Sequence, residues 1–190
     1  IGKPLSPYAV TKYVNEVYSE VYKRTFDFNS IGLRYFNVFG PRQSPKGAYA
    51  AVIPRWINAV ILNSEVKIFG DGETSRDFSF VKNVVQANIL AATTQKKEAL
   101  NQVYNIAVGE STSLTSLLEM IVSDLRDLGV AYDRKAIYSD FRKGDVRHSM
   151  ANINKAKILL GYEPEYSLKE GLEEAMPWYL DSIKKNQLGN

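Results

Sequence analysis

Tyr8 and Lys12 are the first residues whose types and spacing suggest catalysis, because they lie four positions apart near the start of a predicted helix. Positions i and i+4 share one face of a helix, so the phenol and the ammonium can reach one substrate. A tyrosine with its usual pKa of about 10 is a poor base at neutral pH, but a neighbouring cation favours the phenolate. Such a pair can take a proton from a hydroxyl while hydride leaves the same carbon. The spacing alone also arises by chance on amphipathic helices.

An anionic small molecule is a possible ligand, because a few well-placed arginines suffice to bind one. Guanidinium groups match the oxygens of a diphosphate in pairs, and a carboxylate accepts hydrogen bonds from a vicinal diol. A structural alternative is that Arg76 forms a surface ion pair with Asp77, which would contribute little stability. His148 is expected to be structural or to support other residues, because nothing near it in the sequence completes a catalytic triad.

The composition excludes several classes of site. The chain has 190 residues, 45% of them apolar, which suits one sizeable core. It has no cysteine, which excludes disulfides, thiolate nucleophiles and Cys-ligated metals, and its single histidine excludes metal sites that need two. The net charge of +3 comes from interspersed charges rather than a basic stripe, so we expect no nucleic-acid partner. Neither a membrane span nor a signal peptide is visible, and we expect a cytoplasmic protein.

Helical and strand-like segments alternate along the chain, which predicts an α/β fold. Ser6 followed by Pro7 predicts one helix start, and a Ser-Leu-Lys-Glu capping box at 167–170 predicts another. Pro177 is expected to kink or break that last helix. The predicted helices cover 7–23, 54–62, 83–93, 113–128, 154–160 and a segment from 167 onward, and the predicted strands cover 30–39, 66–69, 76–81 and 103–107.

The segment Gly70-Asp71-Gly72 has the first two glycines of a dinucleotide-binding turn. It lacks the third glycine, and it opens no predicted helix. We therefore predict a hairpin turn at this point in the chain, rather than a loop that binds a nucleotide cofactor.

Several motifs, taken in order, resemble those of one family. They are Ser-Pro-Tyr-Ala-Val-Thr-Lys at 6–12, Leu-Arg-Tyr-Phe-Asn-Val-Phe-Gly-Pro-Arg at 33–42, Ala-Val-Ile-Pro at 51–54, Gly-Asp-Gly-Glu-Thr-Ser-Arg-Asp-Phe at 70–78, Val-Tyr-Asn-Ile-Ala at 103–107 and Arg-Lys-Gly-Asp-Val-Arg-His-Ser at 142–149. Their order and separation resemble the extended short-chain dehydrogenase/reductase family. Within it the chain is most similar to bacterial UDP-N-acetylglucosamine 4-epimerases of surface-polysaccharide pathways, such as O-antigen synthesis.

The resemblance implies a fold and its division. The chain is expected to hold the C-terminal part of an NAD(P)-binding Rossmann-type sheet and a small α/β substrate-binding domain. Residues 1–48 would be the last elements of the Rossmann domain, including the catalytic helix and the following strand. Residues 49–190 would form mainly the substrate-binding domain, with about 77–107 returning to the Rossmann domain.

The resemblance also implies a role for each candidate residue. Tyr8 is the expected catalytic base and acid, and Lys12 is expected to bind the nicotinamide ribose of NAD and to tune Tyr8. Tyr35 and Val38 are expected to lie against the cofactor, and no metal is implied. Expected contacts with a UDP-sugar come from Asn37, Ala51, Val52, Trp56, Lys67, Arg76, Arg142, Asp145 and Ser149.

Within that set, Asn37, Arg76 and Arg142 are expected on the diphosphate and Asp145 on the ribose hydroxyls. The backbone at 51–52 is expected to meet the nucleotide, and position 67 contacts the uracil in relatives. Two structural alternatives remain open, since an asparagine can cap a strand end and a tryptophan on an apolar helix face is more often part of a core.

Ser149 bears on the choice of sugar. In these epimerases the corresponding position lies beside the 2-substituent of the sugar, so a bulky aromatic there excludes an N-acetyl group and a small residue admits it. Serine at this position therefore implies that N-acetylated sugars are accepted. The alternative is that Ser149 is an ordinary polar loop residue.

The implied activity is the NAD-dependent interconversion of UDP-N-acetylglucosamine and UDP-N-acetylgalactosamine by transient oxidation at C4. Tyr8 would take the 4-hydroxyl proton as hydride leaves C4, and the keto sugar would turn over while its UDP portion stays bound. Two alternatives remain open: a nucleotide-sugar 4,6-dehydratase or UDP-glucuronate decarboxylase on the same scaffold, and a non-catalytic module that binds nucleotide sugars. A homodimer through the Tyr8 helix is also implied.

Members of the family carry a Gly-rich NAD turn, and a catalytic serine or threonine upstream of the tyrosine. This sequence contains neither feature before Tyr8. The chain is therefore expected to be the C-terminal portion of an epimerase, which by itself would neither bind NAD tightly nor turn over substrate.

Overall fold

Helix α1 (Pro7–Phe26) begins where the sequence predicts and runs three residues further. The computed structural model describes residues 4–47, 50–142 and 144–188. The Ser6 hydroxyl accepts a hydrogen bond from the N–H of Ala9 at 3.2 Å, and Pro7 occupies the first turn, where its missing N–H costs nothing. The helix ends at Asp27 in the left-handed conformation, with φ of 51°.

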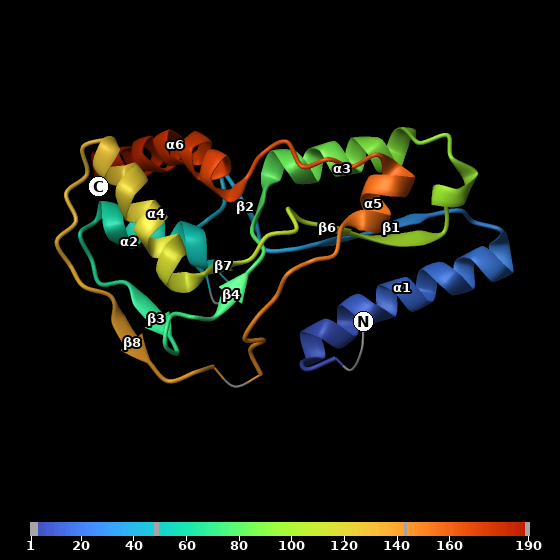
Figure 1. Ribbon diagram of the computed structural model, residues 1–190, viewed down its shortest axis with the longest axis horizontal. Helices are drawn as coiled ribbons and strands as arrows, with labels where there is room; N and C mark the ends of the chain where they lie inside the picture. Colours follow the sequence, from blue (N-terminus) through green and yellow to red (C-terminus); the bar gives the residue numbers. More distant parts are fainter. Residues whose placement is uncertain (1–3, 48–49, 143, 189–190) are drawn as a thin grey trace.

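Strands β1 (Ile31–Tyr35) and β6 (Gln102–Ile106) form a parallel pair in which Ile31 lies beside Gln102 and Tyr35 beside Ile106. Parallel strands require a crossover connection, and it contains α3 (Val81–Thr93). Figure 1 shows α3 above the two strands and α1 below them. Helix α1 is tied to β1 by the bidentate pair of Glu16 with Arg34.

The hydrophobic cluster around β1 and β6 takes its members from three separate parts of the chain. They come from the strands themselves, from α3 and η1 (Lys97–Ala99), and from α5 (Asn154–Leu160) with its flanks. Residues 151–162 therefore pack with this cluster, a contribution that the division expected from the resemblance does not include. Helix α5 has the predicted bounds and ends at Gly161, whose φ of 72° suits glycine.

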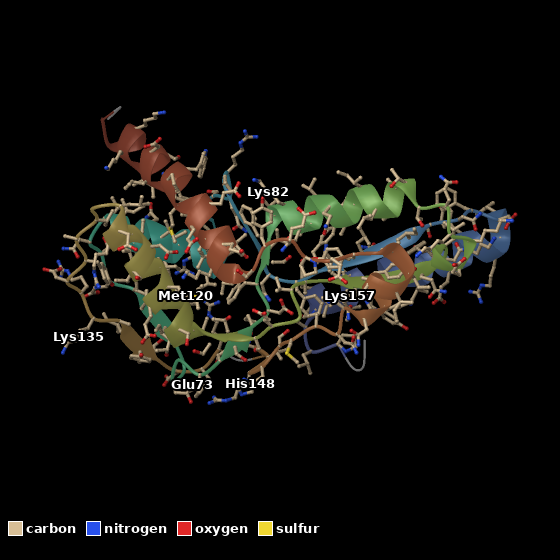
Figure 2. The ribbon with its side chains drawn as sticks, turned by 45° about the horizontal axis from the view of Figure 1, so that its top comes forward. Glu73, Lys82, Met120, Lys135, His148 and Lys157 are labelled. Atoms are coloured by element: carbon tan, nitrogen blue, oxygen red, sulfur yellow. The ribbon has the colours of Figure 1, made fainter. Side chains whose placement is uncertain are left out.

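A second hydrophobic cluster is built mainly from three helices and a short parallel pair. The helices are α2 (Val52–Ile61), α4 (Leu114–Asp127) and α6 (Leu168–Leu188), and the pair is β3 (Lys67–Phe69) with β8 (Ile137–Ser139). Lys82, at the start of α3, forms an ion pair with Glu174 of α6 and so links elements of the two clusters (Figure 2). None of the helices in the described ranges is long and apolar enough to cross a membrane.

Two predicted strands are each split in the structure. The segment 30–39 forms β1 and then β2 (Val38–Phe39), and β2 pairs in parallel with β5 (Ser79–Phe80). The segment 76–81 likewise forms β4 (Ser75–Arg76) and β5, and β4 pairs antiparallel with β7 (Thr112–Ser113). Within each predicted segment the chain thus changes its strand partner after a few residues. The pattern of residue types in one sequence carries no signal for such a change.

The predicted hairpin at Gly70–Gly72 is wrong, and of the two outcomes expected at Pro177, a kink or a break, the break does not occur. Gly70 and Gly72 do form a turn, each with φ of 86°, but β3 pairs with β8 and β4 pairs with β7, so the turn does not close a hairpin. Pro177 does not break α6, which continues to Leu188. Buried residues lie on both sides of the proline, among them Leu172 and Tyr179, and their packing outweighs the roughly 3 kcal/mol that an interior proline costs.

The predicted start of α6 is confirmed. The Ser167 hydroxyl accepts a hydrogen bond from the N–H of Glu170 at 3.3 Å, and the Glu170 carboxylate accepts one from the N–H of Ser167 at 2.8 Å. These two bonds are the reciprocal pair of a capping box. The Ser167 hydroxyl also donates to the Glu170 carboxylate at 2.6 Å. This bond and the one from the Ser167 N–H lower the pKa of Glu170, because both stabilise its ionised form.

Candidate functional site

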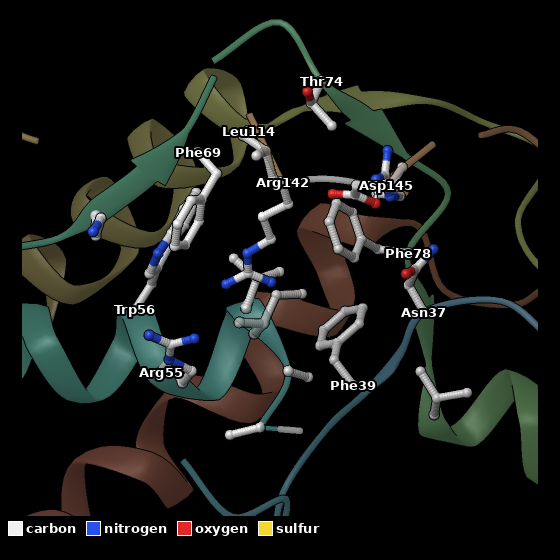
Figure 3. A pocket seen from close by; sticks show the side chains of 17 residues that line it. Asn37, Phe39, Arg55, Trp56, Phe69, Thr74, Phe78, Leu114, Arg142 and Asp145 are labelled. Carbon is white, nitrogen blue, oxygen red and sulfur yellow. Dashed lines mark hydrogen bonds and ion pairs between the residues drawn. The ribbon is translucent and has the colours of Figure 1, made fainter. Parts of the chain in front are cut away.

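A pocket of about 260 Å³ lies where α2, β3 and β4 approach the end of β2 (Figure 3). Most of the residues expected to contact substrate line it, namely Asn37, Ala51, Val52, Trp56, Lys67, Arg76, Arg142 and Asp145. Val38, which the sequence assigns to the cofactor, lines it as well. Residues from five widely separated parts of the chain therefore meet at one cavity.

Asn37 lies in the break between β1 and β2, and its amide nitrogen donates to the carbonyl of Asp77 at 2.8 Å. Asn37 also lines the pocket, so this structural bond does not exclude a contact between its side chain and a ligand. Ala51 is the residue before α2, and no side chain caps this helix start. The first turn of a helix has unsatisfied N–H groups and a positive dipole end, so this wall of the pocket favours an anion.

Arg76 is mostly buried, with 14% of its side chain exposed, and it is held by three acceptors. Its guanidinium lies 2.5 Å from the Asp145 carboxylate and donates to the carbonyls of Ser75 at 2.7 Å and Arg147 at 3.2 Å. The ion pair with Asp77 considered above does not form, because Asp77 is fully buried and bonds to backbone N–H groups instead. The two residues expected on the diphosphate and the ribose thus bond to each other.

Arg142 reaches into the middle of the pocket, with Trp56 and Phe69 on one side and Asn37 on the other (Figure 3). Its guanidinium carbon lies 3.9 Å from the centre of the Phe69 ring, and the Lys67 ammonium lies 5.1 Å from the same ring. Both contacts are cation–π interactions, in which the ring face attracts the cation. The Phe69 ring is thus in contact with two positive charges.

Phe69 and Arg55 are pocket residues that the sequence analysis does not name. For each of them, the distance in sequence from a residue already assigned to the site indicates a place in the pocket. Phe69 is two residues after Lys67 on β3, and alternate residues of a strand share a face. Arg55 is one helical turn after Ala51, so it points to the same side of α2. Neither signal is specific unless the neighbouring residue is already assigned to the site.

The charge of the pocket lining is strongly one-sided. Four cationic side chains line it, those of Arg55, Lys67, Arg76 and Arg142, against the single carboxylate of Asp145. Within the part of the chain that the structure describes, only Arg76 of these four forms an ion pair. A cavity with this excess of positive charge and an aromatic wall suits a ligand that joins a polyanion to a planar ring.

Tyr8 and Lys12 do not line this pocket. The Lys12 ammonium lies 5.1 Å from the centre of the Tyr8 ring, so the two predicted partners are neighbours, and Tyr8 is 68% exposed. The contacts of α1 with β1 show which way the helix runs, since Ser19 bonds to Ser30 and Glu16 to Arg34. The helix is therefore antiparallel to β1, and its start lies toward the carboxyl end of that strand.

The start of α1 also lies beside the segment that carries Arg142 and Asp145. A Cβ added to Gly144 would be 3.8 Å from the carbonyl oxygen of Leu5, three residues before Tyr8. Figure 1 shows the same approach of the helix start to the loop after β8. The start of the helix that carries Tyr8 and the cationic pocket therefore border the same segment of the chain, although Tyr8 does not line the cavity.

Tyr35 and Ser149 also lie outside the pocket lining. The Tyr35 hydroxyl donates to the Asn88 side chain at 2.9 Å, at the carboxyl end of β1. Ser149 is partly buried and its N–H donates to the carbonyl of Ser75 at 3.1 Å. His148 next to it has its Nδ1 atom 3.0 Å from the Ser75 hydroxyl, which agrees with a structural role.

The described residues fit one half of a dinucleotide cofactor. Dinucleotides bind outside the carboxyl ends of parallel strands, where β1 ends at Tyr35 and where α1 presents Tyr8 and Lys12. An exposed phenol and an ammonium are suitable partners for the hydroxyls of a ribose. The Gly70–Gly72 turn follows β3 in the other cluster and starts no helix, so it does not supply a pyrophosphate site.

Comparisons with known proteins agree with this arrangement. The model of the NAD dependent epimerase/dehydratase family matches residues 1–107. A putative UDP-glucose 4-epimerase of Methanocaldococcus jannaschii is 38% identical over 175 residues, which is 92% of this chain and 53% of that protein. The structure is similar to the UDP-N-acetylglucosamine 4-epimerase of Methanobrevibacter ruminantium in complex with UDP-N-acetylmuramic acid, with a TM-score of 0.85, 38% identity, and coverage of 95% of this chain and 55% of that one.

A third similarity is to UDP-glucuronic acid 4-epimerase of Bacillus cereus in complex with UDP-glucuronic acid and NAD. The TM-score is 0.82 at 32% identity, and the match covers 98% of this chain and 55% of that one. The chain thus spans about half the length of the curated relatives it matches. These solved structures confirm the predicted α/β Rossmann-like fold and its correspondence to the C-terminal portion of the relatives.

Proposed function

The chain belongs to the NAD dependent epimerase/dehydratase family, and from that premise we propose that it takes part in the 4-epimerisation of a UDP-linked hexose. The substrate pair we propose is UDP-N-acetylglucosamine and UDP-N-acetylgalactosamine. The observation that carries the proposal is the pocket, in which four cations and an aromatic wall meet at the end of β2. A UDP-sugar has the two features this lining suits, a diphosphate and a planar base.

The nucleotide portion would be held by the pocket. Arg76 and Arg142 would contact the diphosphate, Phe69 and Trp56 would pack against the uracil, and Asp145 would accept the ribose hydroxyls. Binding would then replace the bond between Arg76 and Asp145, since each would gain a ligand partner. Holding the nucleotide while leaving the hexose free lets the sugar present either face to the reacting groups.

Tyr8 would hold and move the proton of the sugar 4-hydroxyl. Lys12, next to its ring, would favour the ionised phenol and would contact the nicotinamide ribose. NAD, when bound, supplies the acceptor and then the donor of hydride at C4. Tyr8 is exposed, and the start of its helix lies near Gly144 in the segment that also supplies Arg142 and Asp145. This supports the assignment, because a hexose extending from the pocket would pass along that segment.

We further propose that the small side chain of Ser149 admits an N-acetyl group on the sugar. Ser149 is fixed to β4 by its backbone bond to Ser75, so a larger side chain at this position would have little freedom to move away. The relatives differ in their sugars, with UDP-glucose, UDP-glucuronic acid and an N-acetylated sugar among the names given above. A residue that selects by size is a simple way to distinguish them.

We also propose that the protein forms a homodimer through α1. No residue of this helix is buried, and its exposed apolar residues recur at helical spacing, at Val10, Val14, Val17 and Val21 with several tyrosines between them. An apolar face of this length marks an interaction surface. Light scattering on the complete gene product should give twice the monomer mass, and a monomer would contradict the proposal.

The experiment for the reaction is incubation of the complete gene product with UDP-N-acetylglucosamine, and separately with UDP-glucose and UDP-glucuronic acid. Formation of UDP-N-acetylgalactosamine supports the proposal. Conversion of only the other two sugars supports epimerisation but contradicts the choice of substrate. A 4-keto-6-deoxy product indicates a dehydratase, a pentose product indicates a decarboxylase, and UDP binding without any conversion indicates a binding module.

A further inference from the structure

Asp77 is a fully buried carboxylate that the proposed reaction does not use. It lies between Arg76 and Phe78, both of which line the pocket, but it does not line the pocket itself. A buried carboxylate is costly unless hydrogen bonds compensate the loss of water. The position of such a group between two pocket residues therefore needs an explanation.

The Asp77 side chain accepts three backbone hydrogen bonds from two distant segments. One oxygen accepts from the N–H of Val108 at 3.0 Å, and the other accepts from the N–H groups of Gly109 at 3.0 Å and Ala151 at 3.2 Å. Val108 and Gly109 follow β6, whereas Ala151 follows the segment that carries Arg142 and Asp145. The carboxylate thus joins the chain after β6 to the end of that segment.

The same short stretch of backbone also holds the walls of the pocket. The carbonyl of Asp77 accepts the Asn37 amide at 2.8 Å. Two residues earlier along the chain, Ser75 donates its N–H to the carbonyl of Arg147 at 2.9 Å, and its carbonyl accepts from the N–H of Ser149 at 3.1 Å. Strand β4 and the segment 147–149 are therefore paired. Just beyond this pairing, the Asp77 carboxylate accepts from the N–H of Ala151, so it holds the two segments together there as well.

Burial raises the pKa of Asp77, while the three N–H groups act in the opposite direction. A carboxylate has two oxygens with several lone pairs, so it can accept hydrogen bonds from three N–H groups at once. A buried carboxylate is therefore most useful where the backbone nearby must be held in a defined geometry.

We propose that Asp77 is a positioning residue for the diphosphate, because its side chain ties the chain after β6 to the end of the segment carrying Asp145, while its own backbone adjoins Arg76 and accepts the Asn37 amide. The inference rests on the proposed function, since it concerns the same pocket. It adds a residue that touches no ligand and acts only through the backbone it holds.

The variant that tests this is Asp77→Asn. Asparagine keeps the size of the side chain, but in either orientation its NH₂ group faces at least one backbone N–H donor. We expect the Kd of UDP to rise at least tenfold. In the reaction, KM should rise by a similar factor while kcat changes by less than about threefold, because Tyr8 is outside the pocket.

Asn83 provides a matched control. It is fully buried, its oxygen accepts from the N–H groups of Glu165 at 3.0 Å and Tyr166 at 3.1 Å, and its nitrogen donates to the carbonyl of Tyr166 at 2.7 Å. It thus joins α3 to the chain before α6 but contributes nothing to the pocket lining. Asn83→Ala should lower Tm while leaving the Kd of UDP within twofold of wild type.

The measurement is calorimetric titration of UDP into the complete gene product and both variants, at a temperature where all three are folded. Weaker binding in Asp77→Asn alone supports the proposal. Unchanged binding in Asp77→Asn, or equal weakening in Asn83→Ala, overturns it. If the wild-type protein itself does not bind UDP, the proposed function fails and this inference fails with it.

A measurement on the wild-type protein covers the case in which Asp77→Asn does not fold. Coupling between two sites is reciprocal, so UDP binding must stabilise the bonds that position its site. Hydrogen exchange at the N–H groups of Val108, Gly109 and Ala151 should slow at least fivefold when UDP is added. The N–H groups bonded to Asn83 should change less, and equal protection of both sets would contradict the proposal.

Discussion

Tyr8 is the residue on which the proposed chemistry depends, and its replacement gives the first prediction. Tyr8→Phe removes only the hydroxyl that moves the proton, so kcat should fall by about 10²- to 10⁴-fold. The Kd of UDP should stay within twofold, because Tyr8 does not line the pocket. Tyr18→Phe is the matched control, since Tyr18 is an exposed tyrosine on the same helix. Retention of more than a tenth of the wild-type kcat by Tyr8→Phe would contradict the assignment.

Ser149 gives a prediction about selectivity. Ser149→Tyr should lower kcat/KM for UDP-N-acetylglucosamine by at least about tenfold relative to UDP-glucose, because an aromatic ring would fill the space assigned to the N-acetyl group. Ser149→Ala serves as the control and should use both sugars as the wild type does. Competition assays with both substrates in one mixture measure the ratio directly. An unchanged ratio in the tyrosine variant would show that this position does not select the sugar.

The pocket residues show how far single residues were predictable. The roles of Arg76, Arg142 and Asp145 were assigned from the family resemblance, which their chemistry supports, and the structure places the three residues at one cavity. The bond between Arg76 and Asp145 was not predicted, because it joins residues 69 positions apart. Phe69 was missed because an aromatic residue on a short strand is usually part of a core, and its contacts with Lys67 and Arg142 become visible only in the structure.

Helix α4 carries a partly buried acid, Asp124, that should weaken the packing of the helix at neutral pH. Burial and the nearby Glu173 and Asp127 raise its pKa, and one of its oxygens is buried with no hydrogen-bond partner. A carboxyl whose pKa is raised in the folded state favours folding most when protonated. Its contribution is therefore lost as the pH rises through that raised pKa.

Asp124→Asn should accordingly raise Tm at pH 7 by roughly 2–4 °C, the shift expected for about 1 kcal/mol in a chain of this size. The gain should disappear at a pH below the pKa of the carboxyl, where Asp124 is already neutral. Thermal unfolding of the complete gene product at several pH values checks this. Glu119→Gln, an exposed change on the same helix, is the control. A gain that does not depend on pH would contradict the explanation.

Elements were predictable where their signals are local. Ser6 with Pro7 and Ser167 with Glu170 mark two helix starts, because caps and first-turn prolines act within four residues. The split of 30–39 into β1 and β2 was not predictable, since it depends on partners that lie 71 residues away for β1 and 41 residues away for β2. The continuation of helix α6 through Pro177 was not predictable either, because it depends on packing against residues that are distant in sequence.

The distribution of charge over the whole pocket predicts a dependence on salt. Four cationic side chains and one carboxylate line the cavity, so attraction of a dianionic ligand should weaken as salt screens the charges. Arg55→Gln should raise the Kd of UDP about two- to fivefold at low ionic strength and less at 0.5 M salt. Arg134→Gln removes the same charge from an exposed residue outside this pocket and should have no such effect.

Titrations of UDP at increasing salt concentrations measure both slopes. A smaller slope for Arg55→Gln than for Arg134→Gln is the expected result. Equal slopes would mean that the net charge of the protein, rather than the pocket, attracts the ligand. The distinction matters because the chain as a whole carries only a small positive charge of +3.

The α/β architecture was predictable from the sequence, but the residues that belong to each of the two hydrophobic clusters were not. Alternating segments predict the class of fold, whereas the return of 151–162 to the β1–β6 cluster depends on contacts such as that of Tyr162 with Ala107. The pocket lies where segments of both clusters meet, so its completeness depends on this long-range assembly. Patterns within short stretches of sequence do not indicate which distant segments come together.

The most direct test of the proposed reaction is to follow deuterium placed at C4 of UDP-N-acetylglucosamine through turnover by the complete gene product. Oxidation and reduction at one carbon, with the same hydride returned, predict UDP-N-acetylgalactosamine that keeps the deuterium at C4, with none gained from solvent when unlabelled substrate reacts in D₂O. Loss of the label to water, or a product changed at another carbon, would contradict the account.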